Sequence, residues 1–175
     1  MLSYIVIALI VLVAGFLAVA SQRPDTFRVE RSTRINARPD RVYGHLDDFH
    51  KWGAWSPWDK LDPAMTRTFS GPSTGIGAGY EWNGSRKVGM GRMEITDVSV
   101  PNRLVLRLDF IKPFKATNTT EFTLAGNGES TDVTWAMYGP SPLMSKVMGV
   151  LMNMDKMIGA DFEKGLANLK SVAEG

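Results

Sequence analysis

The sequence contains no cysteine, which excludes disulfides, thiolate nucleophiles and metal sites held by cysteine. Histidine is almost as scarce. The only two, His45 and His50, are five positions apart and would point to different faces of a helix, so a histidine metal site is not expected. No basic block is present either, because 20 Lys and Arg and 18 Asp and Glu are spread along the chain. We therefore expect no metal, no cofactor and no nucleic-acid partner.

One long uncharged segment occupies residues 2–20 and is rich in Ile, Leu, Val and Ala. About 20 such residues can cross a bilayer, so we interpret residues 1–21 as a transmembrane anchor. A cleaved signal peptide is the alternative, because Ala18-Val19-Ala20 matches a cleavage pattern. The run is long for a signal peptide, however, and no Lys or Arg precedes it. A buried core helix would have to be apolar on all sides.

The flank of this segment indicates an orientation. Several arginines follow the apolar run, and by the positive-inside rule they favour a cytoplasmic domain: Arg23, Arg28, Arg31 and Arg34. Residues 22–26 are polar and contain Pro24, so they are interpreted as a linker. A single domain is expected over residues 27–172.

This domain begins with a strand, because Phe27, Val29 and Ile35 alternate with charged residues. A short helix starting at Pro39 follows. After Pro63, alternating runs separated by Gly, Asn and Pro predict six antiparallel strands: 65–70, 79–82, 87–98, 103–110, 116–124 and 131–138. The pair Asn83-Gly84 predicts a type I′ turn, and Gly126-Asn127-Gly128 predicts a second hairpin with positive φ.

The last segment predicts one helix of about thirty residues, capped by Ser141 with Pro142 as its first residue. A long antiparallel sheet needs its apolar face covered, and only this helix is long enough to lie across it. The sequence therefore predicts an α+β fold in which the sheet meets the C-terminal helix. A cavity is expected where the two fit imperfectly.

A tryptophan-rich tract runs from Phe49 to Asp59 and contains three of the five tryptophans, spaced three apart: Trp52, Trp55 and Trp58. This spacing places them on one side of a short helix or turn. Because an indole is large and apolar with one N–H donor, the tract is typical of a core corner or of the mouth of an apolar cavity.

The element order and two segments carry a family resemblance. Residues 35–43 (Ile-Asn-Ala-Arg-Pro-Asp-Arg-Val-Tyr) and 49–57 (Phe-His-Lys-Trp-Gly-Ala-Trp-Ser-Pro) resemble the polyketide cyclase/dehydrase and lipid-transport group of the START-like, Bet v 1-like (SRPBCC) superfamily. The resemblance covers roughly residues 27–170. It implies a helix-grip fold, in which the sheet wraps the C-terminal helix around an apolar pocket. It implies no single reaction, because this superfamily includes carriers, receptors, co-chaperones and a few enzymes.

Catalytic motifs are few. Ser73 lacks the strand-to-helix elbow of a serine nucleophile, and the glycine-rich residues 75–79 precede a strand rather than a helix, so they are interpreted as a hairpin or pocket-rim loop. Acid–base chemistry has more candidates in the strands, with Glu94 preferred: Glu81, Glu94, Asp109, Glu121 and Tyr138. The alternative, which we favour, is that these side chains point outward and pair with arginines.

Five of the ten methionines lie in the last segment, where flexible thioethers fill a core or adapt to apolar ligands. With the aromatic residues of the strands, they suggest a ligand pocket. The expected lining residues are Trp55, Trp58, Trp82, Phe110, Phe114, Trp135, Met148 and Met152.

These observations favour a membrane-tethered, non-catalytic binding module for a hydrophobic small molecule or lipid, held between the sheet and the C-terminal helix. An enzyme of the cyclase or dehydratase type, acting in the same pocket, is an alternative; an inward-facing carboxyl without an arginine partner would favour it. A protein-interaction module is another, and an apolar patch exposed outside the pocket would favour that.

Overall fold

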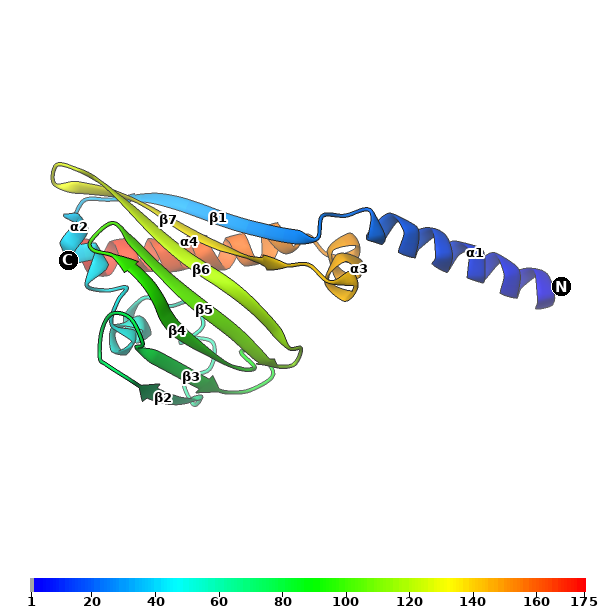
Figure 1. Cartoon of the computed structure of the whole chain (residues 1–175), viewed down its shortest axis with the longest axis horizontal. Coiled ribbons are helices and arrows are strands. Elements are labelled where there is room, and N and C mark those ends of the chain that lie inside the picture. Colours follow the sequence, from blue (N-terminus) through cyan, green and yellow to red (C-terminus); the bar gives the residue numbers. More distant parts are fainter. Residues whose placement is uncertain (1) are drawn as a thin grey trace.

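The structure, a computed structural model, describes residues 2–175 and consists of an apolar helix followed by an α+β domain (Figure 1). Seven strands form one antiparallel sheet in the order β1-β7-β6-β5-β4-β3-β2. The strands are β1 (Thr26–Ile35), β2 (Thr66–Ser70), β3 (Gly79–Asn83), β4 (Met90–Ser99), β5 (Arg103–Lys112), β6 (Ala116–Asn127) and β7 (Ser130–Pro140). The first strand of the chain thus pairs with the last.

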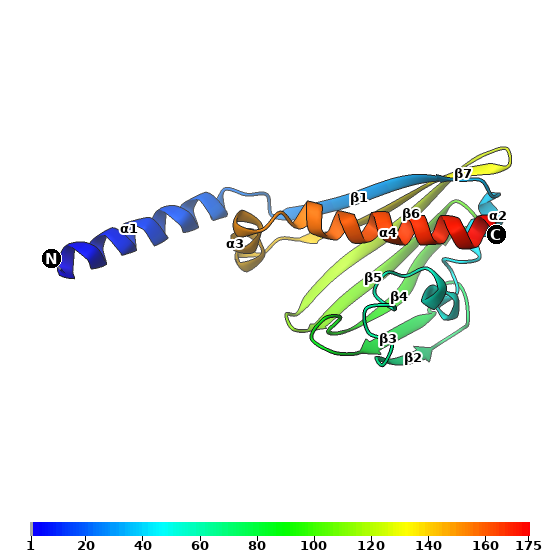
Figure 2. The same cartoon turned by 180° about the vertical axis from the view of Figure 1, so that it is seen from behind.

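Five helical segments accompany the sheet: α1 (Leu2–Ser21), α2 (Pro39–Tyr43), the 3₁₀ helix η1 (Phe49–Ala54), α3 (Leu143–Leu151) and α4 (Met154–Glu174). The longest, α4, runs along one face of the sheet on the side of β1 (Figure 2). We call this the inner face. The predicted helix-grip architecture is confirmed, since the sheet and α4 enclose one apolar core.

All six strands predicted after Pro63 form, and their ends shift by at most three residues, as at the start of β4 (Met90 rather than Lys87). The predicted type I′ turn at Asn83-Gly84 is wrong, because among residues 2–175 only glycines adopt positive φ and Gly84 is not one of them. A six-residue loop, 84–89, connects β3 to β4 instead, and Gly89 has the positive φ of 67°. Gly84 is required for space, since a Cβ there would meet Val88 at 2.5 Å and Asp62 at 2.8 Å.

The predicted single C-terminal helix is two helices. Met152 is extended, with φ −133° and ψ 137°, and ends α3. Asn153 then caps α4, because its side-chain oxygen accepts a hydrogen bond from the backbone N–H of Lys156 at 2.9 Å. The predicted cap at Ser141 is also displaced, since α3 begins at Leu143 after Pro142 and has no side-chain cap. This break separates the methionines of α3 from the helix that lies on the sheet.

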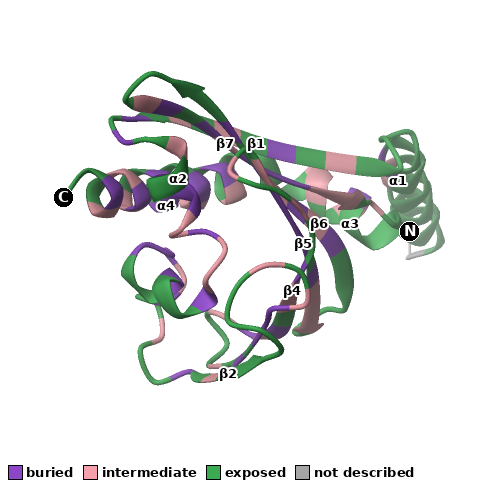
Figure 3. Ribbon diagram, turned by 60° about the vertical axis from the view of Figure 1, so that its left-hand side comes forward, coloured by how far each residue is buried: buried purple, intermediate pink, exposed green. Residues whose placement is uncertain are grey.

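The N-terminal helix α1 projects away from the domain (Figure 1) and is almost entirely exposed. Residues 3–21 are long enough and apolar enough to span a membrane, which makes α1 a candidate span. Its C-terminal end is the exception to its exposure: Ala20 is fully buried, and α1 contacts α3 there. A coloured view of burial shows the same contrast between α1 and the domain core (Figure 3).

Candidate functional site

The candidate site lies on the inner face of the sheet. Alternation along the strands directs one set of side chains to this face, and strand register aligns them in rows. One row crosses six strands and consists of Tyr80, Met93, Leu108, Asn118, Gly139 and Phe27. Apart from Asn118 and the glycine, these residues are large and apolar, as expected for a surface that faces a core or an apolar ligand.

One end of the inner face is closed by an aromatic cluster beneath α4. Trp135 of β7 stacks on Phe162 of α4 with ring centroids 4.2 Å apart. Trp55 and Trp58 approach Trp135 edge-on at 5.5 and 5.7 Å, and Phe122 lies 5.0 Å from it. The structure therefore brings together three predicted pocket residues, Trp55, Trp58 and Trp135. In this region, rings in mutual contact occupy the space between sheet and helix.

The tryptophan tract serves mainly as a core corner. The indole N–H of Trp52 donates to the carbonyl of Leu46 at 2.9 Å, and that of Trp55 donates to the carbonyl of His45 at 3.0 Å. Both side chains are buried. These bonds join the tract to the segment before η1, and both indoles pack edge-on against Phe122 of β6, so the tract closes a corner of the core. Trp58, which is only half-buried, borders the face itself.

Trp135 differs from the other tryptophans of this cluster. Its side chain is 2% exposed, and within residues 2–175 its indole Nε1 has no hydrogen-bond partner. A buried donor without an acceptor costs about 1–3 kcal/mol. The N–H is therefore a polar group that an oxygen atom of a ligand or a water could satisfy.

A second aromatic group lies on the same face, nearer the other edge of the sheet, on β3 and β5. Trp82 of β3 packs edge-on against Phe110 of β5 at 6.1 Å, and its N–H donates to the carbonyl of Val88 at 3.1 Å. The indole also covers Gly91, where a Cβ would meet the ring at 2.5 Å. Both Trp82 and Phe110 were predicted pocket residues, and both lie on the inner face of the sheet.

From one of these aromatic groups to the other, the inner face is incompletely covered. Several apolar side chains pack against the core yet stay half-buried, and we call them the open apolar face: Phe27, Trp58, Met93, Phe110 and Ile158. They come from strands β1, β4 and β5, from α4 and from the segment after η1. The open apolar face is thus bordered by the elements that the resemblance assigns to a ligand pocket.

A buried amide lies in the middle of this apolar surface. Asn118 of β6 is 7% exposed and is flanked in its row by Leu108 and Gly139. A Cβ at Gly139 would approach the Asn118 side-chain oxygen to 2.5 Å, so only glycine leaves room for the amide there. Sequence reasoning missed Asn118. Its inward position in the alternation of β6, next to the buried Thr120 and Phe122, was the available signal.

Three predicted pocket residues lie away from the inner face. Phe114 is at the turn between β5 and β6 and is 76% exposed. Met148 in α3 is 39% exposed and Met152, just after it, is 42% exposed. The physical reason is the helix break at Met152, because α3 turns off the end of the sheet and packs beside α1 (Figure 2).

The carboxylates considered for acid–base chemistry alternate onto the outer face, opposite α4. Glu94 pairs with Arg92 at 2.8 Å, and Glu121 pairs with Arg103 at 3.2 Å while accepting a hydrogen bond from Tyr138 at 2.9 Å. Burial alone would raise the pKa of Asp109, but its hydrogen bonds from Thr117 and Arg107 outweigh burial and lower that pKa. The interpretation that such residues pair with arginines is confirmed for Glu94, Asp109 and Glu121.

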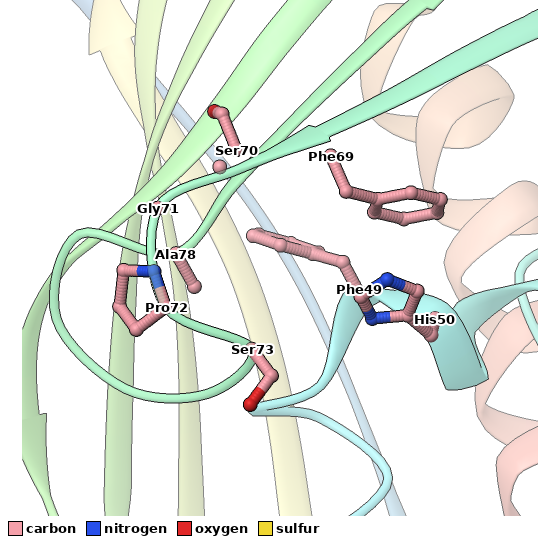
Figure 4. Close-up of a pocket in the computed structure, with 9 residues that line it drawn as sticks. Phe49, His50, Phe69, Ser70, Gly71, Pro72, Ser73 and Ala78 are labelled. Carbon is pink, nitrogen blue, oxygen red and sulfur yellow. The ribbon is translucent and has the colours of Figure 1, made fainter.

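A separate cavity of about 200 Å³ lies at the β2 edge, between η1 and the loop after β2 (Figure 4). His50 stacks on Phe69 with ring centroids 4.0 Å apart, and its Nδ1 lies 3.0 Å from an oxygen of Asp48. Burial raises the pKa of Asp48, but hydrogen bonds from His50 prevail and lower it overall. Ala78 and Gly79 of the glycine-rich loop border this cavity, which is separate from the inner face where the ligand pocket was expected. No cluster of three metal-ligating side chains occurs in residues 2–175.

A sequence model of the family described as polyketide cyclase / dehydrase and lipid transport matches residues 26–174. This is nearly the whole domain beyond α1. A comparison with curated protein sequences gave no match.

Solved structures show the same fold at low identity. Protein CV1439 from Chromobacterium violaceum is 16% identical with a TM-score of 0.60, covering 87% of this chain and 99% of its own. A protein from Thermobifida fusca is 18% identical with a TM-score of 0.62, covering 83% and 92%. The Aha1 dimer from Colwellia psychrerythraea is 15% identical with a TM-score of 0.56, covering 85% and 96%. At these identities the likeness establishes the fold alone.

Proposed function

Because this chain belongs to the polyketide cyclase / dehydrase and lipid transport family, we propose that it is a membrane-tethered binding module for a hydrophobic small molecule or lipid. In this proposal residues 1–21 anchor the chain, residues 22–26 link it, and residues 27–172 hold the ligand. The observation that carries the proposal is the open apolar face, where large apolar side chains stay half-buried beside α4. A ligand lying there would remove this apolar surface from water.

Two polar groups specify what such a ligand would carry. The Asn118 amide lies in the central row of the inner face, and the Trp135 N–H is buried without an acceptor. A ligand with an apolar body and at least one oxygen acceptor would match both. Lipids and polyketide-like molecules have this composition, whereas a pure hydrocarbon would leave the indole N–H unpaired.

Binding is favoured over catalysis by the direction of the carboxylates. Glu94, the preferred acid–base candidate, faces away from α4 and has Arg92 as its partner. The same is true of Glu121, which pairs with Arg103. A proton-transfer mechanism on the inner face would need a group within hydrogen-bond reach of the substrate. We expect Glu94→Gln to leave ligand binding, and turnover of any substrate, unchanged. A large loss of turnover would favour the enzyme alternative.

The full chain purified from its own host in mild detergent provides the test. Native mass spectrometry, followed by organic extraction, should show one lipid or polyketide-like molecule per chain. Phe110→Asp places a charge on the open apolar face and should abolish this mass. Val100→Asp is the control, because Val100 is exposed in the turn between β4 and β5, outside the face, and it should retain the ligand. Wild-type protein without bound mass that takes up no fluorescent lipid would refute the proposal.

One observation favours a protein-interaction module as a second candidate. Exposed apolar side chains gather outside the inner face, on α3 and at the start of α4. Such patches mark surfaces that contact proteins or membranes. This patch lies beside α1, the candidate membrane span, and its position therefore favours contact with a membrane over contact with a protein.

A further inference from the structure

We propose that the end of the domain nearest α1 is a membrane-docking face, which lies on the surface of a bilayer containing anionic lipid. This inference rests on the proposed function in one respect, that α1 spans the same bilayer. It adds two contacts that a simple tether would lack. One is α3 with the start of α4, and the other is the turn between β5 and β6.

The first contact is a set of exposed apolar side chains that we call the methionine face: Met144, Met148, Leu151, Met152, Met154 and Met157. Their exposed fractions range from 37% to 69%. Within α3, Met144, Met148 and Leu151 follow the spacing i, i+4, i+7 and therefore form one stripe. Unbranched thioethers adapt to an irregular apolar environment such as the acyl-chain boundary of a bilayer.

The opposite side of α3 is fixed in place. Lys146 is 8% exposed, and its Nζ forms an ion pair with Asp25 at 2.6 Å. The backbone N–H of Ser141 donates to the carbonyl of Asp25 at 2.7 Å. Asp25 belongs to the segment that joins α1 to β1, so these bonds tie α3 to the base of α1. The stripe of α3 therefore cannot turn toward the sheet without breaking them.

The chain between α1 and β1 is short. Only residues 22–25 separate Ser21 from Thr26, and four residues extend at most about 14 Å. This exceeds one headgroup layer, roughly 5–8 Å on each side of the bilayer, by less than the diameter of a helix, about 10 Å. If α1 spans the bilayer, α3 must lie at or near its interface. An amphipathic helix in that position inserts its apolar side among the headgroups.

The second contact is the β5–β6 turn, residues 112–115, which we call the basic tip. Phe114 is 76% exposed and has Lys112 and Lys115 on either side. The neighbouring loop 84–89 adds Arg86 and Lys87, both exposed, and touches the tip where Gly89 packs on the Lys112 carbonyl. Both loops lie at the end of the sheet nearest α1 (Figures 1 and 2).

The charges of the basic tip, of loop 84–89 and of α3 favour a bilayer with anionic lipid as the partner. Neither the basic tip nor loop 84–89 contains Asp or Glu, and α3 contains no acidic residue. Asp155, which lies between Met154 and Met157 in the sequence, is paired with Arg31 of β1 at 3.1 Å. An apolar stripe and an aromatic side chain flanked by lysines match the chemistry of an anionic membrane surface.

The experiment uses the full chain, whose lack of cysteine allows one label at a chosen position. Single variants Val11→Cys, Met148→Cys, Phe114→Cys, Lys164→Cys and Glu129→Cys are labelled with an environment-sensitive fluorophore. They are reconstituted into vesicles of phosphatidylcholine with about a third phosphatidylglycerol, with and without lipid bearing a quencher near the headgroup. All five positions are exposed, so the substitutions should not disturb the core.

We expect the labels at 148 and 114 to lose most of their fluorescence to the quencher. Labels at 164, farther along α4, and at 129, on the turn between β6 and β7 at the opposite end of the sheet, should lose none. The inference is overturned if the labels at 148 and 114 behave like that at 129. The label at 11 is read with quencher deep in the bilayer and reports the anchor separately, so the failure of docking and of the tether can be told apart.

A charge-reversed variant provides a second measurement. Lys112→Glu with Lys115→Glu should reduce quenching at position 114 severalfold in vesicles with phosphatidylglycerol. In vesicles of phosphatidylcholine alone, the pair should have little effect. Equal quenching of wild type and variant in the anionic vesicles would contradict the assigned role of the basic tip.

Discussion

Trp135 of β7 and Phe162 of α4 stack face to face, with centroids 4.2 Å apart and ring planes within 7° of parallel. This contact joins the sheet to the C-terminal helix at the centre of the core. Both side chains are essentially inaccessible to solvent, with exposed fractions of 2% and 1%. The stack therefore fixes how closely α4 approaches the sheet, and with it the shape of the inner face.

Removing one ring of this stack should be strongly destabilising. Phe162→Ala leaves a cavity between Trp135 and Trp58, and we expect the free energy of unfolding to fall by about 3–5 kcal/mol. Phe162→Leu keeps most of the volume and should cost less than half as much. Urea denaturation followed by tryptophan fluorescence measures both. Equal losses for the two variants would show that the ring is not packed as described.

Trp135→Phe separates packing from hydrogen bonding. Phenylalanine retains a ring against Phe162 but removes the indole N–H, which has no partner among the described residues. Losing an unsatisfied donor offsets part of the packing lost with the larger ring, so we expect a change in stability below about 1.5 kcal/mol. If the N–H binds a ligand oxygen, ligand affinity should fall about tenfold. Unchanged affinity in titration with the extracted ligand would remove Trp135 from the polar part of the site.

Gly165 allows α4 to approach the sheet. A Cβ at this position would lie 2.7 Å from the Trp135 ring and 3.1 Å from Pro57. Gly165→Ala should therefore destabilise the protein by about 1–3 kcal/mol, although alanine is the better helix former by up to ~1 kcal/mol. Gly53→Ala is the control, because nothing lies within 4 Å of its Cβ position. That variant should be neutral or slightly stabilising in thermal unfolding.

His45 makes stability depend on pH. Burial lowers the pKa of His45 below its usual 6.5, and the charges of Lys51 and Arg41 act in the same direction. The unfolded chain then binds more protons than the folded protein just below pH 6.5, so the free energy of unfolding falls as the pH drops through that window. The slope is at most about 1.4 kcal/mol per pH unit for this one group.

His45→Gln should flatten this slope. The substitution preserves the backbone carbonyl that accepts the Trp55 N–H. The comparison is best made between about pH 7 and 5.5, because Asp47, whose pKa is raised by burial, acts with the opposite sign closer to its usual value of 3.8. Identical slopes for wild type and variant, from urea denaturation at each pH, would contradict the role of His45.

Strand positions could be predicted from the sequence because alternation and turn residues are local signals. The same period of two puts Trp82, Phe110 and Trp135 on one face of the sheet, since a strand leaves a side chain only two directions. Phe114 follows no such rule, because it sits in a turn whose direction depends on the neighbouring strands. Its prediction as a lining residue relied on residue type alone.

The helix break was harder to predict. Apolar spacing continues through Met152 and Met154, and although Gly149 lies one turn earlier, no proline or glycine stands at the interruption itself. The available signal was Asn153 followed by Asp155, a cap residue with an acidic side chain in the first turn. A cap inside an apolar periodicity competes with helix continuation, and tertiary contacts decide the outcome. Here the bonds of Lys146 and Ser141 to Asp25 hold α3 beside α1.

The pairing of β1 with β7 also has a consequence for how the protein is made. Thr26 lies opposite Pro140 in this ladder, so the first strand to leave the ribosome has no partner until more than a hundred further residues have been synthesised. Such long sequence separation slows folding, because the loop must close before the contact forms. The meander from β2 to β7 can assemble as it emerges, whereas β1 must wait beside α1. Folding of the domain is therefore completed only after β7 and α4 have left the ribosome and β7 has met β1.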